Sequence, residues 1–169
     1  MKNTNMKIGI FPGSFDPFTN GHINILKQAC RVLDFVIVVI MCQYKRNYLF
    51  STDERAEMIK EVIKEIPNAK VEIFEGILPE YVTERKATAM IRGLRMVADF
   101  EQEIQETSFF QQICPDVETI FFVTPPEERF ITSQGVRNIA MLGGDVSQYV
   151  PEYISLKLKE KYLWDQAGK

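Results

Sequence analysis

Residues 11–26, FPGSFDPFTNGHINIL, lead from an apolar run into a helical pattern and carry the only histidine of the chain, His22. Their prolines and glycines predict a tight turn in which the Ser14 hydroxyl and backbone N–H groups suit phosphate oxygens. The Asn20-Gly21 pair places His22 in the first helical turn, where free N–H groups and the helix dipole favour an anion. Two interpretations of His22 stay open: a phosphate ligand, or a helix cap without a ligand.

Strand and helix patterns alternate on both sides of this turn. The run FVIVVIM (residues 35–41) is typical of a strand buried on both faces. Alternating elements predict βαβ units with right-handed crossovers. We therefore expect an α/β fold, with one doubly wound five-stranded parallel sheet, in a single domain over residues 1–169. The predicted strands are 7–11, 35–41, 70–76, 88–93 and 118–123, and the predicted helices are 23–33, 51–66, 79–86, 99–113, 133–142 and one from near Pro151.

The bulk composition excludes several classes of function. Twenty Lys and Arg against 23 Asp and Glu give a formal net charge of −3, which does not favour nucleic-acid binding. The longest apolar run is far shorter than the roughly 20 residues that span a bilayer, and no signal-type segment precedes the first strand. The thiols of Cys30, Cys42 and Cys114 have neither metal-ligand nor CxxC spacing. We expect a cytoplasmic protein without a membrane or nucleic-acid partner.

Basic side chains follow two of the predicted strands. In doubly wound folds, ligands bind beyond the carboxyl ends of the strands. Lys45 and Arg46 follow the second strand, and Arg92 and Arg95 follow the fourth. Together with His22, they predict an anion site on one rim of the sheet. The alternatives are that Lys45 and Arg46 are solvated loop charges, and that the two later arginines only pair with Asp99 or Glu101.

Other chemistries are disfavoured by the same turn. It matches neither the GxxxxGK phosphate loop nor the GxGxxG dinucleotide fingerprint, and a single histidine excludes a His-rich zinc site. A Ser14–His22–Asp16 triad is disfavoured because Ser14 and Asp16 point to opposite sides of an extended turn, and GxSxG is absent. We expect Asp16 to stabilise the turn through side-chain to backbone bonds. Gly13 is expected to let the backbone approach a ligand.

Two longer motifs resemble a known family. GSFDPFTNGH (residues 13–22) is similar to the GxFDPxTxGH signature of the phosphopantetheine adenylyltransferases, and IRGLRMVADFEQE (91–103) resembles their second signature. ILPEYV and FITSQGVR add to a resemblance over about residues 7–165. It implies a Rossmann-like nucleotidyltransferase fold and AMP transfer from ATP to 4′-phosphopantetheine, giving dephospho-coenzyme A and pyrophosphate. It also implies Mg²⁺ with ATP and a homohexamer. Thr19, where related families more usually have histidine, favours the pantetheine branch.

The resemblance also implies roles for individual residues. The expected catalytic residues are His22, Arg92 and one of Lys45 and Arg46; counting back from Phe50 selects Arg46, and a shift of one residue selects Lys45. The expected acceptor contacts are Ser14, Arg46, Ile77, Leu78 and Arg92. The expected ATP contacts are Ser14, Phe15, His22, Gly93, Leu94, Arg95, Glu103, Ile131, Thr132, Ser133 and Gln134.

The segments around residues 43–50 and 128–135 depart from the family pattern. QYKRNYLF replaces a loop richer in lysine, TSQG replaces a run of serines, and Glu128 stands where an aromatic residue is common. Two rival functions are therefore kept: AMP or CMP transfer to a different phosphorylated acceptor, and a non-catalytic nucleotide-binding module.

Overall fold

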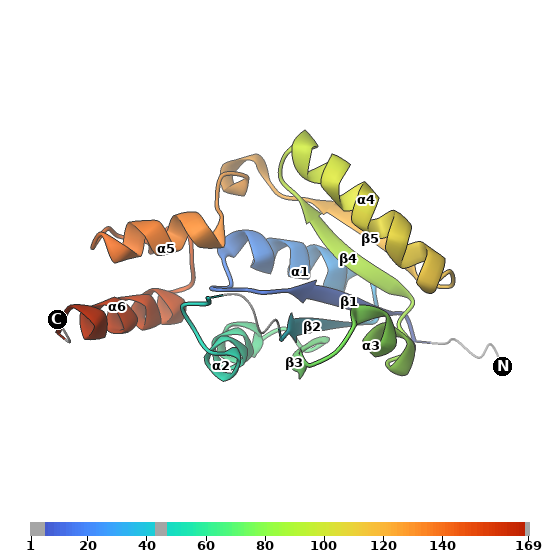
Figure 1. The fold of residues 1–169 in the computed structure, drawn as a ribbon, viewed down its shortest axis with the longest axis horizontal. Coiled ribbons are helices and arrows are strands. Elements are labelled where there is room, and N and C mark those ends of the chain that lie inside the picture. The colour runs from blue at the N-terminus through green and yellow to red at the C-terminus, as the bar shows by residue number, and fades with distance from the viewer. Residues whose placement is uncertain (1–5, 43–46, 168–169) are drawn as a thin grey trace.

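Five parallel strands form the centre of the molecule in the order β3-β2-β1-β4-β5 (Figure 1). The computed structural model describes residues 6–42 and 47–167. The strands are β1 (Ile8–Gly13), β2 (Phe35–Met41), β3 (Ala69–Phe74), β4 (Ala89–Leu94) and β5 (Glu118–Val123). The helices are α1 (Asn20–Val32), α2 (Thr52–Ile63), α3 (Leu78–Glu84), α4 (Val97–Ile113), α5 (Ser133–Met141) and α6 (Glu152–Ala167). The predicted doubly wound parallel sheet is confirmed.

Helices cover both faces of this sheet, and each face has its own apolar cluster. One cluster joins the sheet to α1, α2, α5 and α6, and the other joins it to α3 and α4. In β2, Val36, Val38 and Ile40 belong to the first cluster, whereas Ile37 and Val39 belong to the second. Every side chain of β2 from 36 to 40 is therefore buried, which explains why this strand is apolar without alternation.

The helix starts follow the predicted capping signals. In α2, the Glu54 N–H donates to Ser51 Oγ over 3.1 Å, and the Ser51 N–H donates to Glu54 Oε2 over 2.6 Å. This is the capping box that the sequence predicts. The first helix begins at Asn20 rather than at Ile23, because Thr19 is its N-cap. His22 therefore lies in the first helical turn, as expected.

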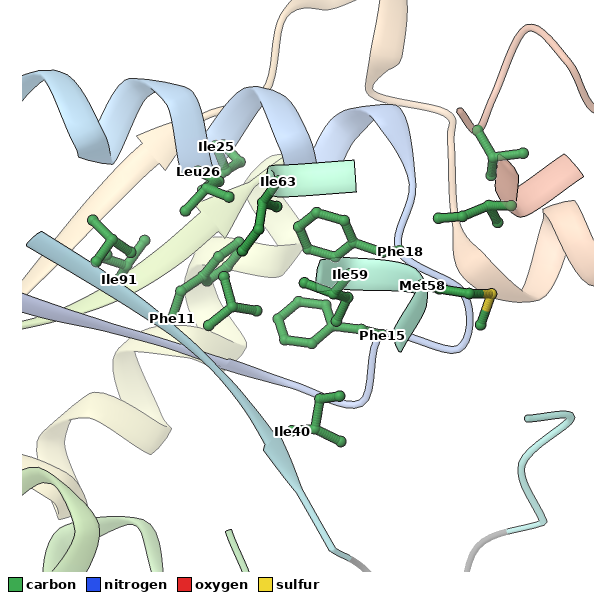
Figure 2. Close-up of a cluster of buried hydrophobic side chains, with 14 of the residues drawn as sticks. Phe11, Phe15, Phe18, Ile25, Leu26, Ile40, Met58, Ile59, Ile63 and Ile91 are labelled. Atoms are coloured by element: carbon green, nitrogen blue, oxygen red, sulfur yellow. The ribbon is translucent and has the colours of Figure 1, made fainter. Parts of the chain in front are cut away.

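The turn between β1 and α1 is held by its own aromatic side chains. The ring of Phe15 is 3 % exposed and makes edge contacts with Phe11 and Phe18, at centroid distances of 5.3 and 5.1 Å. In Figure 2 the rings of Phe15 and Phe18 lie beside Ile59 of α2. The backbone of Phe15 has a φ of 49°, in the left-handed region that non-glycine residues rarely adopt. Burial of the ring therefore offsets the cost of an unfavourable backbone conformation.

Gly13 is required by this packing. A Cβ on Gly13 would lie 2.6 Å from the end of the Phe15 ring. The sequence led us to expect close approach to a ligand, and the structure adds the Phe15 ring as a second group that needs the space. Because that ring is enclosed on several sides, it has little freedom to move away.

We expect Gly13→Ala to lower the free energy of unfolding by about 1–3 kcal/mol through overpacking. Gly21→Ala is the matched control, because the nearest atom to a Cβ there is 3.7 Å away and alanine is a better helix former than glycine. Denaturant unfolding measures both variants. Equal stability of the two variants would contradict the packing explanation.

Candidate functional site

A cavity of about 260 Å³ opens between the turn after β1, the carboxyl end of β4 and the start of α5. Strands β1 and β4 are neighbours, and the chain order reverses between them. This is the switch point at which ligands bind in doubly wound sheets. We name this space the first cavity. Its lining comprises Phe11, Pro12, Gly13, Ser14, Phe15, Thr19, Gly21, His22, Ile25, Arg92, Gly93, Arg95, Glu103, Thr124, Ile131, Thr132 and Ser133.

A second cavity, of about 380 Å³, adjoins the first along the end of β1. Ser14 and Arg92 line both cavities, so the two spaces meet at a hydroxyl and a guanidinium. Most of the remaining wall is apolar, apart from the Glu106 carboxylate and a thiol. The complete lining of this second cavity is Pro12, Gly13, Ser14, Met41, Cys42, Gly76, Ile77, Leu78, Arg92 and Glu106.

The predicted site residues are largely brought together at these two cavities. Of the residues expected as acceptor contacts, four line the second cavity: Ser14, Ile77, Leu78 and Arg92. Two of the expected ATP contacts, Leu94 and Gln134, line neither cavity, and the exposed Gln134 side chain instead contacts Arg137 and Asn138. The other expected ATP contacts line the first cavity: Ser14, Phe15, His22, Gly93, Arg95, Glu103, Ile131, Thr132 and Ser133. Lys45 and Arg46 lie outside the described residues, so the choice between them stays open.

His22 is fixed in one orientation by the helix start. The Thr19 N–H donates to Nδ1 of His22 over 3.0 Å, and Thr19 Oγ1 lies 3.1 Å from the same nitrogen. Because Nδ1 is an acceptor, the proton of the neutral ring is on Nε2. His22 is thus a cap, and its second nitrogen remains a donor for a ligand in the first cavity. The structure shows the capping role, and the role as a phosphate ligand stays a prediction.

The surroundings keep the imidazole neutral. Phe18 stacks on the ring at a centroid distance of 5.4 Å, and Phe15 contacts it edge-on at 5.2 Å. Burial and, as the smaller cause, the positive charge of Arg95 together lower the pKa of His22 from 6.5 to about 4. At neutral pH the ring therefore offers a phosphate an uncharged N–H donor.

Asp16 joins the turn to two distant segments. Its carboxylate is 1 % exposed and accepts the N–H groups of Leu49 and Phe50 over 2.9 and 3.0 Å. Arg137 of α5 pairs with the same carboxylate at 3.3 Å and also donates to the Asp16 carbonyl. Side-chain to backbone bonds were expected, but their partners are far along the chain. No hydrogen bond among the described residues joins Ser14, Asp16 and His22 as a triad would require.

Arg92 lies between two carboxylates of α4. Its Nε is 3.3 Å from Glu103 Oε2, and its terminal nitrogen is 3.6 Å from Glu106 Oε2. Neither Arg92 Nε nor Glu103 Oε2 has a hydrogen-bond partner of good geometry among the described atoms. Burial raises the pKa of Glu103, against the opposing charge of Arg92. The guanidinium is thus held in place but retains donors for a further anion.

Arg95 pairs with Asp99, as one of the open alternatives anticipated. Its Nε lies 3.3 Å from Asp99 Oδ2, and its backbone N–H donates to the same oxygen over 3.1 Å. Arg95 also lines the first cavity, so pairing does not remove it from the site. For Arg92, by contrast, that alternative named the wrong carboxylates, because Glu103 and Glu106 are farther along the helix.

The start of α5 forms the opposite wall. The Thr132 hydroxyl accepts the Gly135 N–H over 2.9 Å, and the Ser133 hydroxyl donates to the Pro17 carbonyl over 2.9 Å. Both hydroxyls therefore also hold the local structure. Thr124, which is 3 % exposed, completes this wall.

Several residues of the site have no clear signal in the sequence. Three residues line the cavities because they lie at the ends of strands: Thr124 at the end of β5, and Met41 and Cys42 at the end of β2. Arg55 and Arg137 hold the turn from outside the cavities, and their long-range partners have no local spacing pattern. Glu106 has a signal, because it is spaced i,i+3 from Glu103 on the helix that follows the two arginines.

Comparison with known proteins agrees with this geometry. The sequence profile of the cytidylyltransferase-like family matches residues 10–139. Two solved structures share the fold: a putative nicotinate-nucleotide adenylyltransferase from Vibrio parahaemolyticus, and a bifunctional NMN adenylyltransferase/ADP ribose pyrophosphatase from Francisella tularensis. The first has a TM-score of 0.67 and 19 % identity over 91 % of this chain and 99 % of its own. The second has a TM-score of 0.65 and 16 % identity over 92 % of this chain and 49 % of its own. The chain belongs to the cytidylyltransferase-like nucleotidyltransferases.

Named relatives with higher sequence identity show which branch of this family the chain belongs to. A phosphopantetheine adenylyltransferase from Caldanaerobacter subterraneus subsp. tengcongensis is 44 % identical over 93 % of this chain and 98 % of its own length. One from Syntrophomonas wolfei subsp. wolfei is 41 % identical over 95 % of this chain and 99 % of its own. The chain therefore belongs to the phosphopantetheine adenylyltransferase family, as the two signatures indicated. Within the described residues, no helix is both long and apolar enough to cross a membrane.

The neutral state of His22 is directly testable, because the chain has one histidine and hence one imidazole Cε1 proton signal. We expect this signal, followed by NMR from pH 8 to the acid limit of folding, to show no titration near 6.5 and to move only near pH 4. Between about pH 6.5 and pH 4 the unfolded state binds a proton at His22 and the native state does not. The free energy of unfolding therefore decreases as the pH falls through this range. A midpoint near 6.5 in the folded protein would contradict the buried, neutral ring.

Proposed function

We propose that this protein transfers AMP from ATP to 4′-phosphopantetheine, giving dephospho-coenzyme A and pyrophosphate, by direct in-line attack. The observation that carries the proposal is the meeting of two cavities at Ser14 and Arg92. ATP is assigned to the first cavity, which has the histidine and the hydroxyl-bearing start of α5. The acceptor is assigned to the second, whose apolar wall suits the pantetheine arm.

The reaction needs no general base, because the acceptor phosphate is already an anion. One of its oxygens forms a bond to the α-phosphorus of ATP while the bond to the β-phosphate oxygen breaks, and pyrophosphate leaves on the opposite side. Catalysis then depends on positioning and on stabilising charge on the phosphoryl oxygens. His22 Nε2–H is the neutral donor assigned to the α-phosphate, since Nδ1 is held by Thr19.

The arginines are assigned to the outer phosphates. Arg92 faces both cavities and is assigned to the acceptor phosphate, with Arg95 on the leaving phosphates in the first cavity. A guanidinium suits both places because its planar donors bind phosphate oxygens in pairs. The remaining assignment, a cation from Lys45 or Arg46, rests on the family resemblance.

Mg²⁺ is proposed to enter with ATP. The described residues contain no group of three or more His, Cys, Asp or Glu side chains arranged to hold a metal ion. Mg²⁺ commonly binds through substrate phosphates with few protein ligands, which fits a cavity whose only carboxylate in the described lining, Glu103, is beside Arg92. When bound, the ion neutralises charge on the triphosphate. A cytoplasmic location is proposed as well, and the described thiols are all free, as a reducing compartment requires.

Pyrophosphate production tests the proposed activity. With ATP and Mg²⁺, we expect release in the presence of 4′-phosphopantetheine and none with nicotinate mononucleotide. Release only with the nucleotide would replace the acceptor, and silence with both acceptors from protein that binds ATP would favour a non-catalytic nucleotide-binding module.

The same assay examines His22. A hydrogen bond to a charged group contributes roughly 1.5–3 kcal/mol, so His22→Ala is expected to lower kcat by about tenfold to a hundredfold or more. Near-normal turnover in a variant that still binds ATP would remove His22 from the mechanism. Arg31→Ala, on the last turn of α1 and away from both cavities, is the control.

We also propose that the protein is a homohexamer. The support from this chain is helix α4, whose side chains Val97, Phe109 and Ile113 are between 65 and 79 % exposed. Apolar side chains gathered on one helix are typical of an interface. A second copy of the chain is the natural occupant under the family resemblance.

Sedimentation measures the assembly. We expect a species several times larger than the 19.6 kDa chain, and we expect Phe109→Glu to shift it toward smaller species. Leu163→Glu, a similar change on exposed α6, is the control. A monomer of the unmodified protein would overturn the proposed hexamer without affecting the proposed activity.

A further inference from the structure

We propose that Arg55 is a positioning residue for the phosphate-binding turn. Its guanidinium holds the Ser14 carbonyl toward α2 and thereby fixes the Phe15 N–H as a donor facing the ATP cavity. The inference rests on the function proposed above, and it adds a residue that lines neither cavity.

Arg55 is built into the core, and each of its three guanidinium nitrogens donates a hydrogen bond. The side chain is 1 % exposed, although it is one of the largest and most polar in the chain. Its Nη1 donates to the Ser14 carbonyl over 2.5 Å, its Nη2 donates to Thr52 Oγ1 over 3.1 Å, and its Nε donates to the Ser51 carbonyl over 3.3 Å. The guanidinium therefore has a fixed place behind the turn.

This buried cation has no anionic partner in the described part of the chain. None of the ion pairs found there includes Arg55, and its flat face lies over the ring of Tyr48 at 4.2 Å. A buried charge is costly unless it is compensated. The Ser14 carbonyl, which receives the shortest of its hydrogen bonds, belongs to the peptide that borders the cavity for an anionic ligand.

The geometry of the peptide links the direction of the Ser14 carbonyl to that of the Phe15 N–H. In a planar trans peptide, the carbonyl of Ser14 and the N–H of Phe15 point in opposite directions. With the carbonyl facing α2, the N–H faces away from α2, and Phe15 is one of the residues that line the first cavity. No described group accepts a hydrogen bond from this N–H.

The conformation of Phe15 supports a functional reason for this arrangement. Its φ of 49° is unfavourable for a residue with a bulky side chain. The buried ring holds one side of the residue and Arg55 holds the preceding carbonyl, so the N–H direction is fixed from both ends. Donation into the carbonyl also polarises the peptide and strengthens its N–H as a donor.

A second arginine that contacts the same turn, Arg137 of α5, shows what is particular to Arg55. Arg137 also donates to a carbonyl of this turn, that of Asp16. The next residue there is Pro17, which has no N–H to present. Of these two arginines, only Arg55 acts on a peptide that carries a donor for a phosphate oxygen.

NMR with selective labels observes this donor directly. With ¹³C′-serine and ¹⁵N-phenylalanine, an HNCO spectrum shows only Ser-Phe pairs, and the chain has two, Ser14-Phe15 and Ser108-Phe109. Phe109 lies on exposed α4 and is the internal control. We expect ATP with Mg²⁺, and separately pyrophosphate, to move the Phe15 amide proton downfield and to leave Phe109 in place. An unmoved Phe15 signal in protein shown by calorimetry to bind ATP would overturn the proposal.

Kinetics separate positioning from simple stabilisation. We expect Arg55→Met to lower kcat at least about tenfold, with less than about a twofold change in KM for the acceptor, and to reduce the ATP-induced shift of Phe15. Arg55→Lys keeps a charge and one donor and should recover part of both effects. Arg85→Met and Arg85→Lys, in the surface contacts of α3 with Glu72, are matched controls. Lower stability in Arg55→Met with normal kcat and a normal Phe15 shift would make Arg55 structural only.

Failure of this inference is distinguishable from failure of the proposed function. If Arg55→Met does not fold, Arg55→Lys and the spectra of the unmodified protein still decide the matter. If the unmodified protein releases no pyrophosphate with 4′-phosphopantetheine, the proposed reaction fails. In that case, the response of the Phe15 amide to ATP and to pyrophosphate still confirms or overturns the positioning role.

Discussion

The buried carboxylate of Asp16 is the contact on which the rest of the site depends. It accepts the N–H groups of Leu49 and Phe50 and pairs with Arg137, so three segments far apart in the sequence meet at one group. A carboxylate without partners at 1 % exposure would strongly disfavour the folded state. The turn after β1, the entry to α2 and the first turns of α5 therefore hold one another in place. This arrangement sets both walls of the first cavity.

The turn after β1 is anchored by side chains from other elements of the fold. The carbonyls of Ser14, Asp16 and Pro17 accept from Arg55, Arg137 and Ser133. These side chains satisfy the backbone acceptors within the protein, while the aromatic rings of the turn enter the core. The surface that remains toward the cavity is then rich in donors, which is the character that a phosphate site requires.

Local patterns in the sequence predicted the elements and the edge of the sheet where the site lies. The apolar run of β2, the Ser51–Glu54 capping box and the position of His22 each depend on residues a few places apart, and each is found as expected. The partners of Asp16 were not predictable in this way. Residue 16 meets residues 49 and 137 only after the sheet has formed, and spacing along the chain does not encode that contact. Gly13 shows the same limit, because the family resemblance implies an ATP contact for Phe15 and nothing in the sequence indicates that its ring packs against Gly13.

The charges of the site explain why a neutral His22 is suited to a cavity that Arg92 and Arg95 also line. Two anions, a triphosphate and an acceptor phosphate, must be brought together in a chain of net charge −3. Glu103 and Glu106 hold Arg92 in position before a ligand arrives, and Arg92 lines both cavities. A charged imidazole in the aromatic pocket of His22 would lack its hydration and would repel Arg95. A neutral N–H donor from His22 at the reacting phosphate therefore suits the stability of the free protein. It also suits the proposed reaction, in which Arg92 and Arg95 supply the full positive charges.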